Sequence, residues 1–129
     1  MSAKRTNPPF TNGVPEMLLL HLLAREPLYG YQLVQAIREA SGQTLEFGEG
    51  CIYPILHRLE ADGLLSSRRQ TVGGRSRVVY RTTAAGSRQL GASVDHWQRI
   101  TAAVRQVLGA AEQNRLLGGD GHGRPAVAT

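Results

Sequence analysis

The chain has 129 residues, of which 41% are hydrophobic and 19% charged, and its formal net charge is +5. This length leaves room for one compact domain with terminal extensions and excludes a two-domain enzyme. The single cysteine excludes an intramolecular disulfide and a cysteine-based zinc site. No apolar run reaches the ~20 residues of a membrane span and no signal-peptide pattern opens the chain, so we expect a cytoplasmic protein with no membrane partner.

Two helices are predicted after a polar N-terminal arm over residues 1–13. The first begins at Val14 and ends before Pro27, because the residue that precedes a proline is steered away from helical angles. Its leucine-rich sequence is apolar on nearly all sides, which predicts a central position in the fold. After a turn over 26–30, the second helix runs from about Tyr31 to Gly42, which ends it as a left-handed cap.

The third predicted helix, over residues 51–61, carries the clearest pattern. Its apolar residues have the i, i+3, i+4, i+7 spacing of one buried face, namely Ile52, Ile55, Leu56 and Leu59. The opposite face has little bulk and consists of Pro54, His57, Arg58 and Ala61, with Gly50 and Cys51 at the near end and Tyr53 at the side. Pro54 is expected in the first turn, where a proline is tolerated. Such a face can approach another surface closely.

A β-hairpin is predicted next, with strands over residues 64–72 and 75–82. The glycine pair between them, Gly73-Gly74, suits a two-residue turn with positive φ at both positions. This turn fixes the facing pairs as Val72 with Arg75, Gln70 with Arg77, and Arg68 with Val79.

Positive charge is concentrated around this hairpin. The segment 65–88 holds six of the fifteen basic residues and none of the ten acidic ones. Outside it, nine basic residues are balanced by ten acidic ones, so the positive excess belongs to this segment. The six are Arg68, Arg69, Arg75, Arg77, Arg81 and Arg88. Like charges on paired strands repel, so stability alone explains the hairpin poorly, and a polyanionic partner is predicted. The alternative is a solvated arginine surface that has no partner.

The last predicted helix covers residues 84–111, with Thr83 as its N-cap. Residues on one side of it are spaced alternately by four and three, as in a coiled-coil seam. They are Leu90, Val94, Trp97, Thr101, Val104, Leu108 and Ala111. This pattern predicts pairing with the same helix of a second copy, with part of the helix packed against the first helix. The alternative is a helix folded back on its own domain. The glycine-rich residues 112–129 are expected to form a flexible tail.

The order of three helices, a hairpin and a long helix predicts a mostly α fold with a small β-hairpin, the winged helix-turn-helix. The sequence resembles short-type PadR-family transcriptional regulators in three segments, PLYGY at 27–31, GCIYPILHRLEADGL at 50–64 and YRTTAAG at 80–86. The resemblance covers about Val14 to Leu108. It implies a winged helix over 14–83 and a single dimerisation helix over 84–111. Cys51 departs from the family, which usually has Thr or Ser there, so a hydroxyl contact at this position is in doubt.

The resemblance also implies a function, a homodimer that binds a double-stranded DNA operator with an inverted repeat and represses transcription. Arg58 and His57 are candidates for contacts with base edges. Tyr53 and Pro54 are candidates for positioning the helix against the DNA backbone. The full set of candidate DNA-binding residues is Gly50, Cys51, Tyr53, Pro54, His57, Arg58, Arg68, Arg69, Arg75 and Arg77. The candidate dimerisation residues are Leu90, Val94, Trp97, Val104 and Leu108. The alternative function is a winged-helix protein-interaction module that does not bind DNA.

Trp97 has two interpretations, packing in the seam or, with Val94, Ile100 and Thr101, forming a site for a flat aromatic effector that releases DNA. Cys51 near a helix N-terminus suggests a redox-sensitive thiol whose pKa the helix dipole lowers. The four histidines lie on different segments without a carboxylate pair, and no phosphate-cradling loop occurs. We therefore expect no enzyme, no catalytic residues, no metal and no cofactor.

Overall fold

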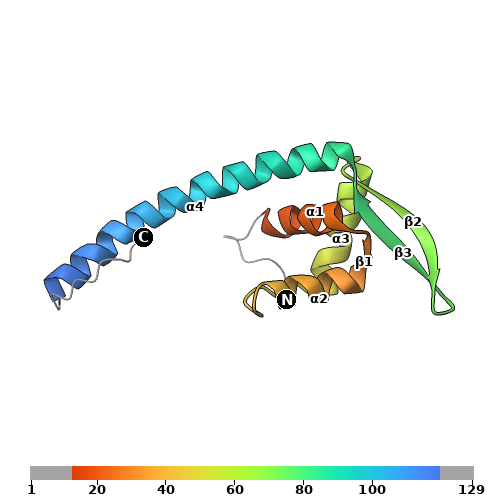
Figure 1. Cartoon of the computed structure of the whole chain (residues 1–129), viewed down its shortest axis with the longest axis horizontal. Helices are drawn as coiled ribbons and strands as arrows, with labels where there is room; N and C mark the ends of the chain where they lie inside the picture. Colours follow the sequence, from red (N-terminus) through yellow and green to blue (C-terminus); the bar gives the residue numbers. More distant parts are fainter. Residues whose placement is uncertain (1–12, 120–129) are drawn as a thin grey trace. The chain divides into compact units, whose positions relative to one another are not determined.

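The computed structural model describes residues 13–119, and side chains are described for residues 13–71 and 73–109. In chain order the elements are α1 (Val14–Arg25), β1 (Leu28–Tyr29), α2 (Gly30–Ala40), α3 (Glu49–Ala61), β2 (Leu65–Val72), β3 (Arg75–Thr82) and α4 (Ala84–Gly119) (Figure 1). The chain divides into two units, the first ending at Ala92 and the second beginning at Ser93. The predicted fold class, mostly α with a small β part, is confirmed.

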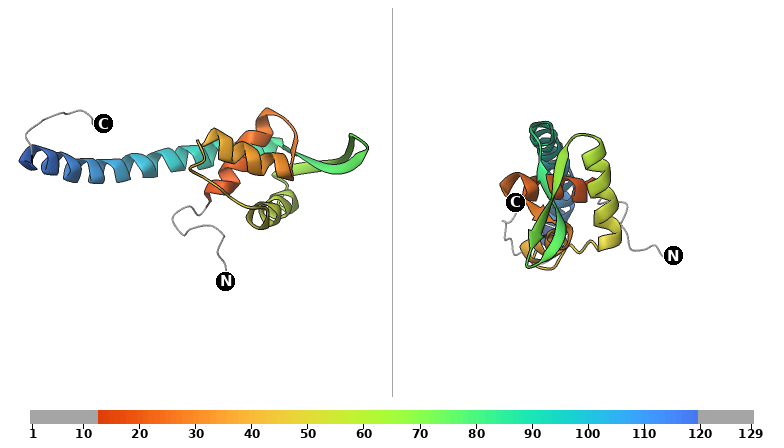
Figure 2. Two further views of the ribbon diagram at one scale, coloured as in Figure 1. Left: turned by 90° about the horizontal axis from the view of Figure 1, so that it is seen from below. Right: turned by 90° about the vertical axis from the view of Figure 1, so that its right-hand side faces the viewer.

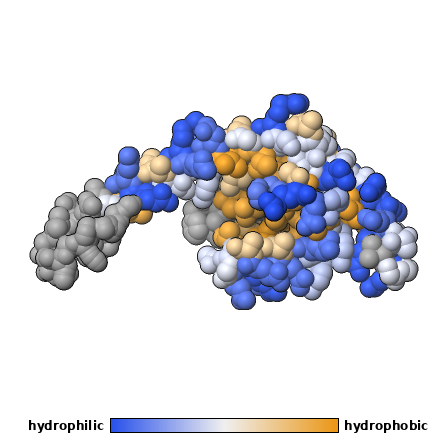
Figure 3. Space-filling view, viewed as in Figure 1, coloured by the Kyte–Doolittle hydropathy of each residue, from blue (hydrophilic) through white to orange (hydrophobic). Residues whose placement is uncertain are grey.

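The core of the first unit comes from all three of its complete helices. Its largest fully buried side chains include Leu19 and Leu20 of α1, Leu33 of α2, and Ile52 and Leu56 of α3. The predicted central position of the first helix is therefore confirmed. In Figure 3 apolar residues gather among these helices, whereas hydrophilic residues follow the β2–β3 ribbon.

Helix α3 begins earlier than predicted. It starts at Glu49, with Gly48 as its N-cap, so Gly50 lies inside the helix and not before it. The four residues of the predicted apolar face are all buried, which confirms that face. The earlier start moves Pro54 past the first turn, and its missing N–H leaves the carbonyl of Gly50 without the usual helical donor.

The sheet has three antiparallel strands in the order β1-β3-β2. The predicted register of the hairpin is confirmed, and Gly73 and Gly74 have φ values of 59° and 80°. The expectation of a turn over 26–30 was wrong, because β1 pairs there with β3 through Leu28 and Tyr29. We call β2, β3 and their turn the wing; it forms a twisted ribbon that reaches beyond the helices of the first unit (Figure 2).

Helix α4 starts as predicted and ends later. The Gly86 N–H donates to the Thr83 hydroxyl oxygen at 3.0 Å, and that hydroxyl donates to the Gly63 carbonyl at 2.7 Å, which confirms the N-cap. Gly86 lies so close to the carbonyl of Leu64 that a Cβ would overlap it. The first turns of α4 therefore belong to the compact first unit, which extends past the predicted boundary at residue 83.

The predicted helix end at residue 111 was wrong, because α4 continues to Gly119. Residues 110–117 are mostly strong helix formers, and the glycines that suggested a tail begin only at Gly118. The arm over 1–12 and the tail over 120–129 lie outside the described residues. Within residues 13–119, no helix is both long enough and apolar enough to cross a membrane.

Candidate nucleic-acid interface

The outer face of α3 is open to solvent and carries few large side chains. Its exposed residues are Gly50, Pro54, His57, Arg58 and Ala61, and Cys51 and Tyr53 beside them are half-buried. Arg58 is the only arginine or lysine on this helix. Another surface can therefore approach this face closely, and Arg58 is the one arginine or lysine that it would meet there.

Arg58 is engaged by the neighbouring helix α1. Its Nη2 lies 2.6 Å from Oε2 of Glu16, and the two side chains are 55% and 26% exposed. This ion pair joins residues 42 positions apart in the sequence, and no spacing rule could have predicted it. Arg58 therefore leans toward α1 and leaves Pro54 and His57 at the centre of the outer face.

Cys51 does not have the predicted low pKa. Burial, and secondarily the negative charge of Glu16, raise the pKa of its thiol above the ordinary value. The helix dipole is outweighed because the thiol loses water and faces a carboxylate. The expectation of a reactive, redox-sensitive Cys51 was therefore wrong in its premise.

The wing presents its arginines mainly on one face. Residues that face each other across an antiparallel pair share a face, and alternate residues along a strand do so too. The observed pairs Ser66 with Arg81, Arg68 with Val79, Gln70 with Arg77 and Val72 with Arg75 thus define one face. We call its four arginines, Arg68, Arg75, Arg77 and Arg81, the arginine face. Sequence reasoning left Arg81 out of the candidate residues, although the register predicted for the hairpin places it here.

The other face of the wing is turned to the helices. It carries Leu65 and Tyr80, which belong to the hydrophobic core, and Ser67, whose hydroxyl donates to Glu60 at 2.6 Å. Arg69, a candidate DNA-binding residue, shares this face at the middle of β2, and its Nη1 donates to Ser76 at 3.2 Å. The structure thus separates Arg69 from the other candidate arginines.

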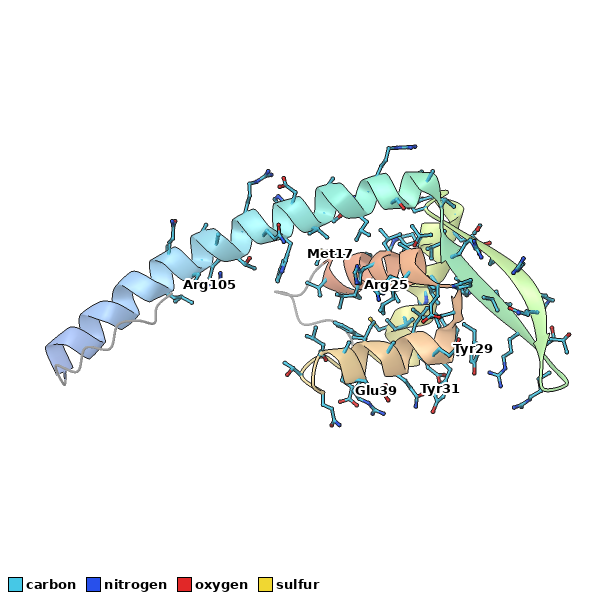
Figure 4. The ribbon with its side chains drawn as sticks, viewed as in Figure 1. Met17, Arg25, Tyr29, Tyr31, Glu39 and Arg105 are labelled. Atoms are coloured by element: carbon cyan, nitrogen blue, oxygen red, sulfur yellow. The ribbon has the colours of Figure 1, made fainter. Side chains whose placement is uncertain are left out.

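Arg77 lies in the half of β3 nearer the turn, and its side chain contacts Tyr29 of β1. Its guanidinium carbon lies 4.2 Å from the centre of the Tyr29 ring, and Figure 4 shows Tyr29 beside this part of the sheet. Its Nε is buried and has no hydrogen-bond partner among the described residues. Arg75, by contrast, is exposed near the tip.

Tyr53 connects α3 to the start of α2. Its ring lies against Gly30 so closely that a Cβ at that position would overlap the ring. Burial raises the pKa of Tyr53, the charge of Glu49 adds to the shift, and the Arg77 guanidinium opposes it. Helix α3 and the start of α2 therefore meet at Tyr53, and Arg77 of β3 is near enough for its charge to act on the phenol.

No acidic side chain among the described residues forms an ion pair with the arginine face. The three ion pairs found between described residues join Arg38 to Glu46, Arg58 to Glu16 and Arg99 to Asp95. None of them includes an arginine of the wing. Over the same residues no group of three or more His, Cys, Asp or Glu side chains is arranged to hold a metal ion.

The predicted seam residues on α4 differ in their surroundings. Leu90 packs against the core of the first unit, which includes residues of α1, and it is therefore not available to the predicted seam. In the second unit the exposed fractions are 41% for Trp97, 49% for Val104 and 62% for Leu108. The neighbouring effector candidates are Ile100, which is 45% exposed, and Val94 and Thr101, which are half-buried. The second unit therefore carries a stripe of apolar side chains that are open to solvent.

Comparisons with known proteins agree on one family. The profile described as "Transcriptional regulator PadR-like family" matches residues 19–92. The chain is 38% identical over 100 residues to "Transcriptional regulator Rv3488" of Mycobacterium tuberculosis, and the match covers 78% of this chain and 88% of that protein.

Solved structures give the same result. The crystal structure of a PadR-family transcriptional regulator from Eggerthella lenta is similar with a TM-score of 0.68 and 33% identity, covering 78% of this chain and 86% of that one. A PadR-family regulator from Clostridium difficile matches with a TM-score of 0.67 and 27% identity, covering 75% and 100%.

Proposed function

This chain belongs to the PadR-like family of transcriptional regulators, and we propose that it acts as a homodimer that binds a double-stranded DNA operator with an inverted repeat and represses transcription. The observation that carries the proposal is the arginine face of the wing, whose four cations have no acidic partner among the described residues. Such a surface attracts a polyanion.

Helix α3 is the element proposed to read the sequence. The major groove of DNA admits an α-helix, and the low bulk of the outer face allows a close approach. His57 and Arg58 are the proposed base-reading residues. Gly50, Cys51, Tyr53 and Pro54 would lie against the sugar-phosphate backbone of the DNA beside them. The wing would then lie on phosphates or in the neighbouring minor groove.

The apolar stripe on α4 supports the proposed dimer. Exposed apolar side chains repeated at seam spacing are typical of a helix that packs against an identical partner. Val94, Trp97, Val104 and Leu108 are the proposed contacts, whereas Leu90 is occupied by its own core. A two-fold dimer requires a two-fold operator, which is why an inverted repeat is expected.

Release by a small aromatic effector is a further part of the proposal. Trp97 offers a flat ring at the stripe, with Val94, Ile100 and Thr101 beside it. A ligand that binds there could release DNA only by favouring a dimer whose two α3 helices are differently spaced. The regulator would work in the cytoplasm, without a cofactor or metal.

The deciding experiment selects fragments of the source genome with the purified full chain at about 150 mM salt, where phosphate-only binding is weakened. Enrichment of a shared inverted repeat, together with a dimer mass by light scattering, is the expected result. A chain that binds neither genomic DNA nor heparin at this salt would overturn the proposal and favour a protein-interaction module.

A further inference from the structure

One acidic residue lies beside the proposed base-reading surface. Glu16 is in the first turn of α1, and its Oε2 holds Nη2 of Arg58 at 2.6 Å. Arg58 is the only arginine or lysine on α3, so this single ion pair engages the one cation that the helix can offer to a base.

The two partners are held unequally. The Glu16 side chain is 26% exposed, and its second oxygen, Oε1, is buried with no hydrogen-bond partner within the described part of the chain. The Arg58 side chain is 55% exposed. The carboxylate is thus the more buried partner, and among the described residues its contact is the side-chain ion pair found for the guanidinium.

The ion pair leaves most of the guanidinium available. Arginine has five N–H donors in a rigid fork, and the contact with Glu16 is made through one terminal nitrogen. A bidentate contact with the O6 and N7 atoms of guanine uses two parallel donors. Arg58 can therefore keep Glu16 and still present a pair of donors outward.

Glu16 lies along the side of α3 that carries both Cys51 and Arg58, which are seven residues and two turns apart. Its charge contributes to the raised pKa of the Cys51 thiol, which agrees with this position. The Glu16 carboxylate thus acts on Cys51 in the N-terminal part of α3 and forms an ion pair with Arg58 in its C-terminal part.

We infer that Glu16 is a specificity-determining residue that positions Arg58 for a base edge and keeps it from the nearest phosphate. This inference rests on the proposed function. A free arginine near DNA reaches phosphates readily, and such contacts add affinity without sequence information. A guanidinium that is already oriented also loses less conformational freedom on binding.

The test is the Glu16→Gln variant, which keeps the size of the side chain and removes its charge. The measured quantity is the ratio of Kd for scrambled DNA to Kd for the selected operator. We expect this ratio to fall about tenfold, within the range for one lost bidentate base contact. Affinity for scrambled DNA should rise severalfold, because a negative charge leaves the interface.

Two controls separate positioning from simple repulsion. Glu49→Gln removes an exposed acid from the same region of α3, and it should raise affinity for both DNAs and leave the ratio unchanged. In an Arg58→Ala background, Glu16→Gln should leave the ratio unchanged, since there is no longer a side chain to position.

Three results would be decisive. If Glu16→Gln raises affinity for both DNAs equally, Glu16 only repels DNA and the inference is overturned. If it lowers the thermal unfolding temperature and leaves the ratio intact, the role is structural and the inference also fails. If the wild-type chain itself selects no operator, the proposed function is overturned, and this outcome is distinct because it does not involve the variant.

Discussion

The guanidinium of Arg77 lies 4.2 Å over the ring of Tyr29, a cation–π contact that ties β3 to β1. Tyr29 pairs with Val79, so Arg77 is its diagonal neighbour on the same face of the sheet. Arg75, two residues nearer the tip, is exposed. Two arginines that look equivalent in the sequence thus have different surroundings, and their substitutions should have different effects.

For Arg75→Ala we expect weaker binding to all DNA sequences, with the slope of log affinity against log salt reduced by about 0.9, the value for one phosphate contact. The melting temperature should not change, because the side chain is exposed. Fluorescence anisotropy over a series of salt concentrations measures the slope. Arg69→Ala, on the opposite face of the wing, is the matched control and should change the slope much less. Equal effects of the two variants would contradict the assignment of the arginine face.

For Arg77→Ala we expect both weaker DNA binding and lower stability. Loss of the contact with Tyr29 should cost about 0.5–1 kcal/mol, the range for partly exposed cation–π pairs. Chemical denaturation of the variant and of Arg75→Ala provides the comparison. A stability equal to that of Arg75→Ala would show that the Tyr29 contact contributes nothing.

For Gly30→Ala we expect a loss of about 1–3 kcal/mol in the free energy of unfolding, because the new methyl group overlaps the Tyr53 ring in a packed region. The double variant Gly30→Ala, Tyr53→Ala should lose less stability than the two single variants added together, because the overlap is gone. Gly91→Ala, on α4 where a Cβ meets nothing within 4 Å, is the control and should stabilise the chain slightly. A Gly30→Ala variant as stable as the wild type would mean that the Tyr53 ring does not need to pack this closely against residue 30.

For Leu108→Glu we expect a monomer in place of the proposed dimer, together with loss of operator binding. Leu108 is 62% exposed on the apolar stripe, and each copy would have to bury a carboxylate in the seam. Light scattering gives the mass. Gln106→Glu adds the same charge on the other side of α4 and should remain dimeric. A dimeric Leu108→Glu would show that the chain does not associate through this stripe.

For Cys51 we expect slow alkylation. The raised pKa leaves less thiolate at any given pH, so at pH 8 the rate with iodoacetamide should be below that of glutathione. Glu16→Gln should increase the rate, because it removes the charge that contributes to the shift. A wild-type rate at or above that of glutathione would contradict the direction of the pKa shift.

Local patterns predicted most of this fold. The spacing of Ile52, Ile55, Leu56 and Leu59 sufficed to orient α3, and the Gly73-Gly74 pair sufficed to set the register of the wing, because both patterns depend only on neighbours in sequence. Strand β1 was missed because two residues show no periodicity, and only its pairing with β3 defines it.

The site was harder to predict than the fold. The pair of Arg58 with Glu16 joins distant segments, and the contact of Arg77 with Tyr29 requires the strand that was missed. The pKa of Cys51 was predicted in the wrong direction, because the helix dipole is visible in the sequence whereas burial and the carboxylate of another helix are not. Contacts of this kind depend on how elements pack, and no periodic pattern encodes them.

The two glycines at the tip of the wing have a consequence for its packing. Both adopt positive φ, and this turn holds β2 and β3 in one register. A slip of one residue would turn the side chains of one strand to the opposite face of the ribbon. Arg69 would then replace Arg68 beside the three arginines of β3, so that face would still carry four arginines. Leu65 at the other end of β2, now 2% exposed, would however turn away from the hydrophobic core. Two residues without side chains thus keep a leucine buried at the far end of the strand that they terminate.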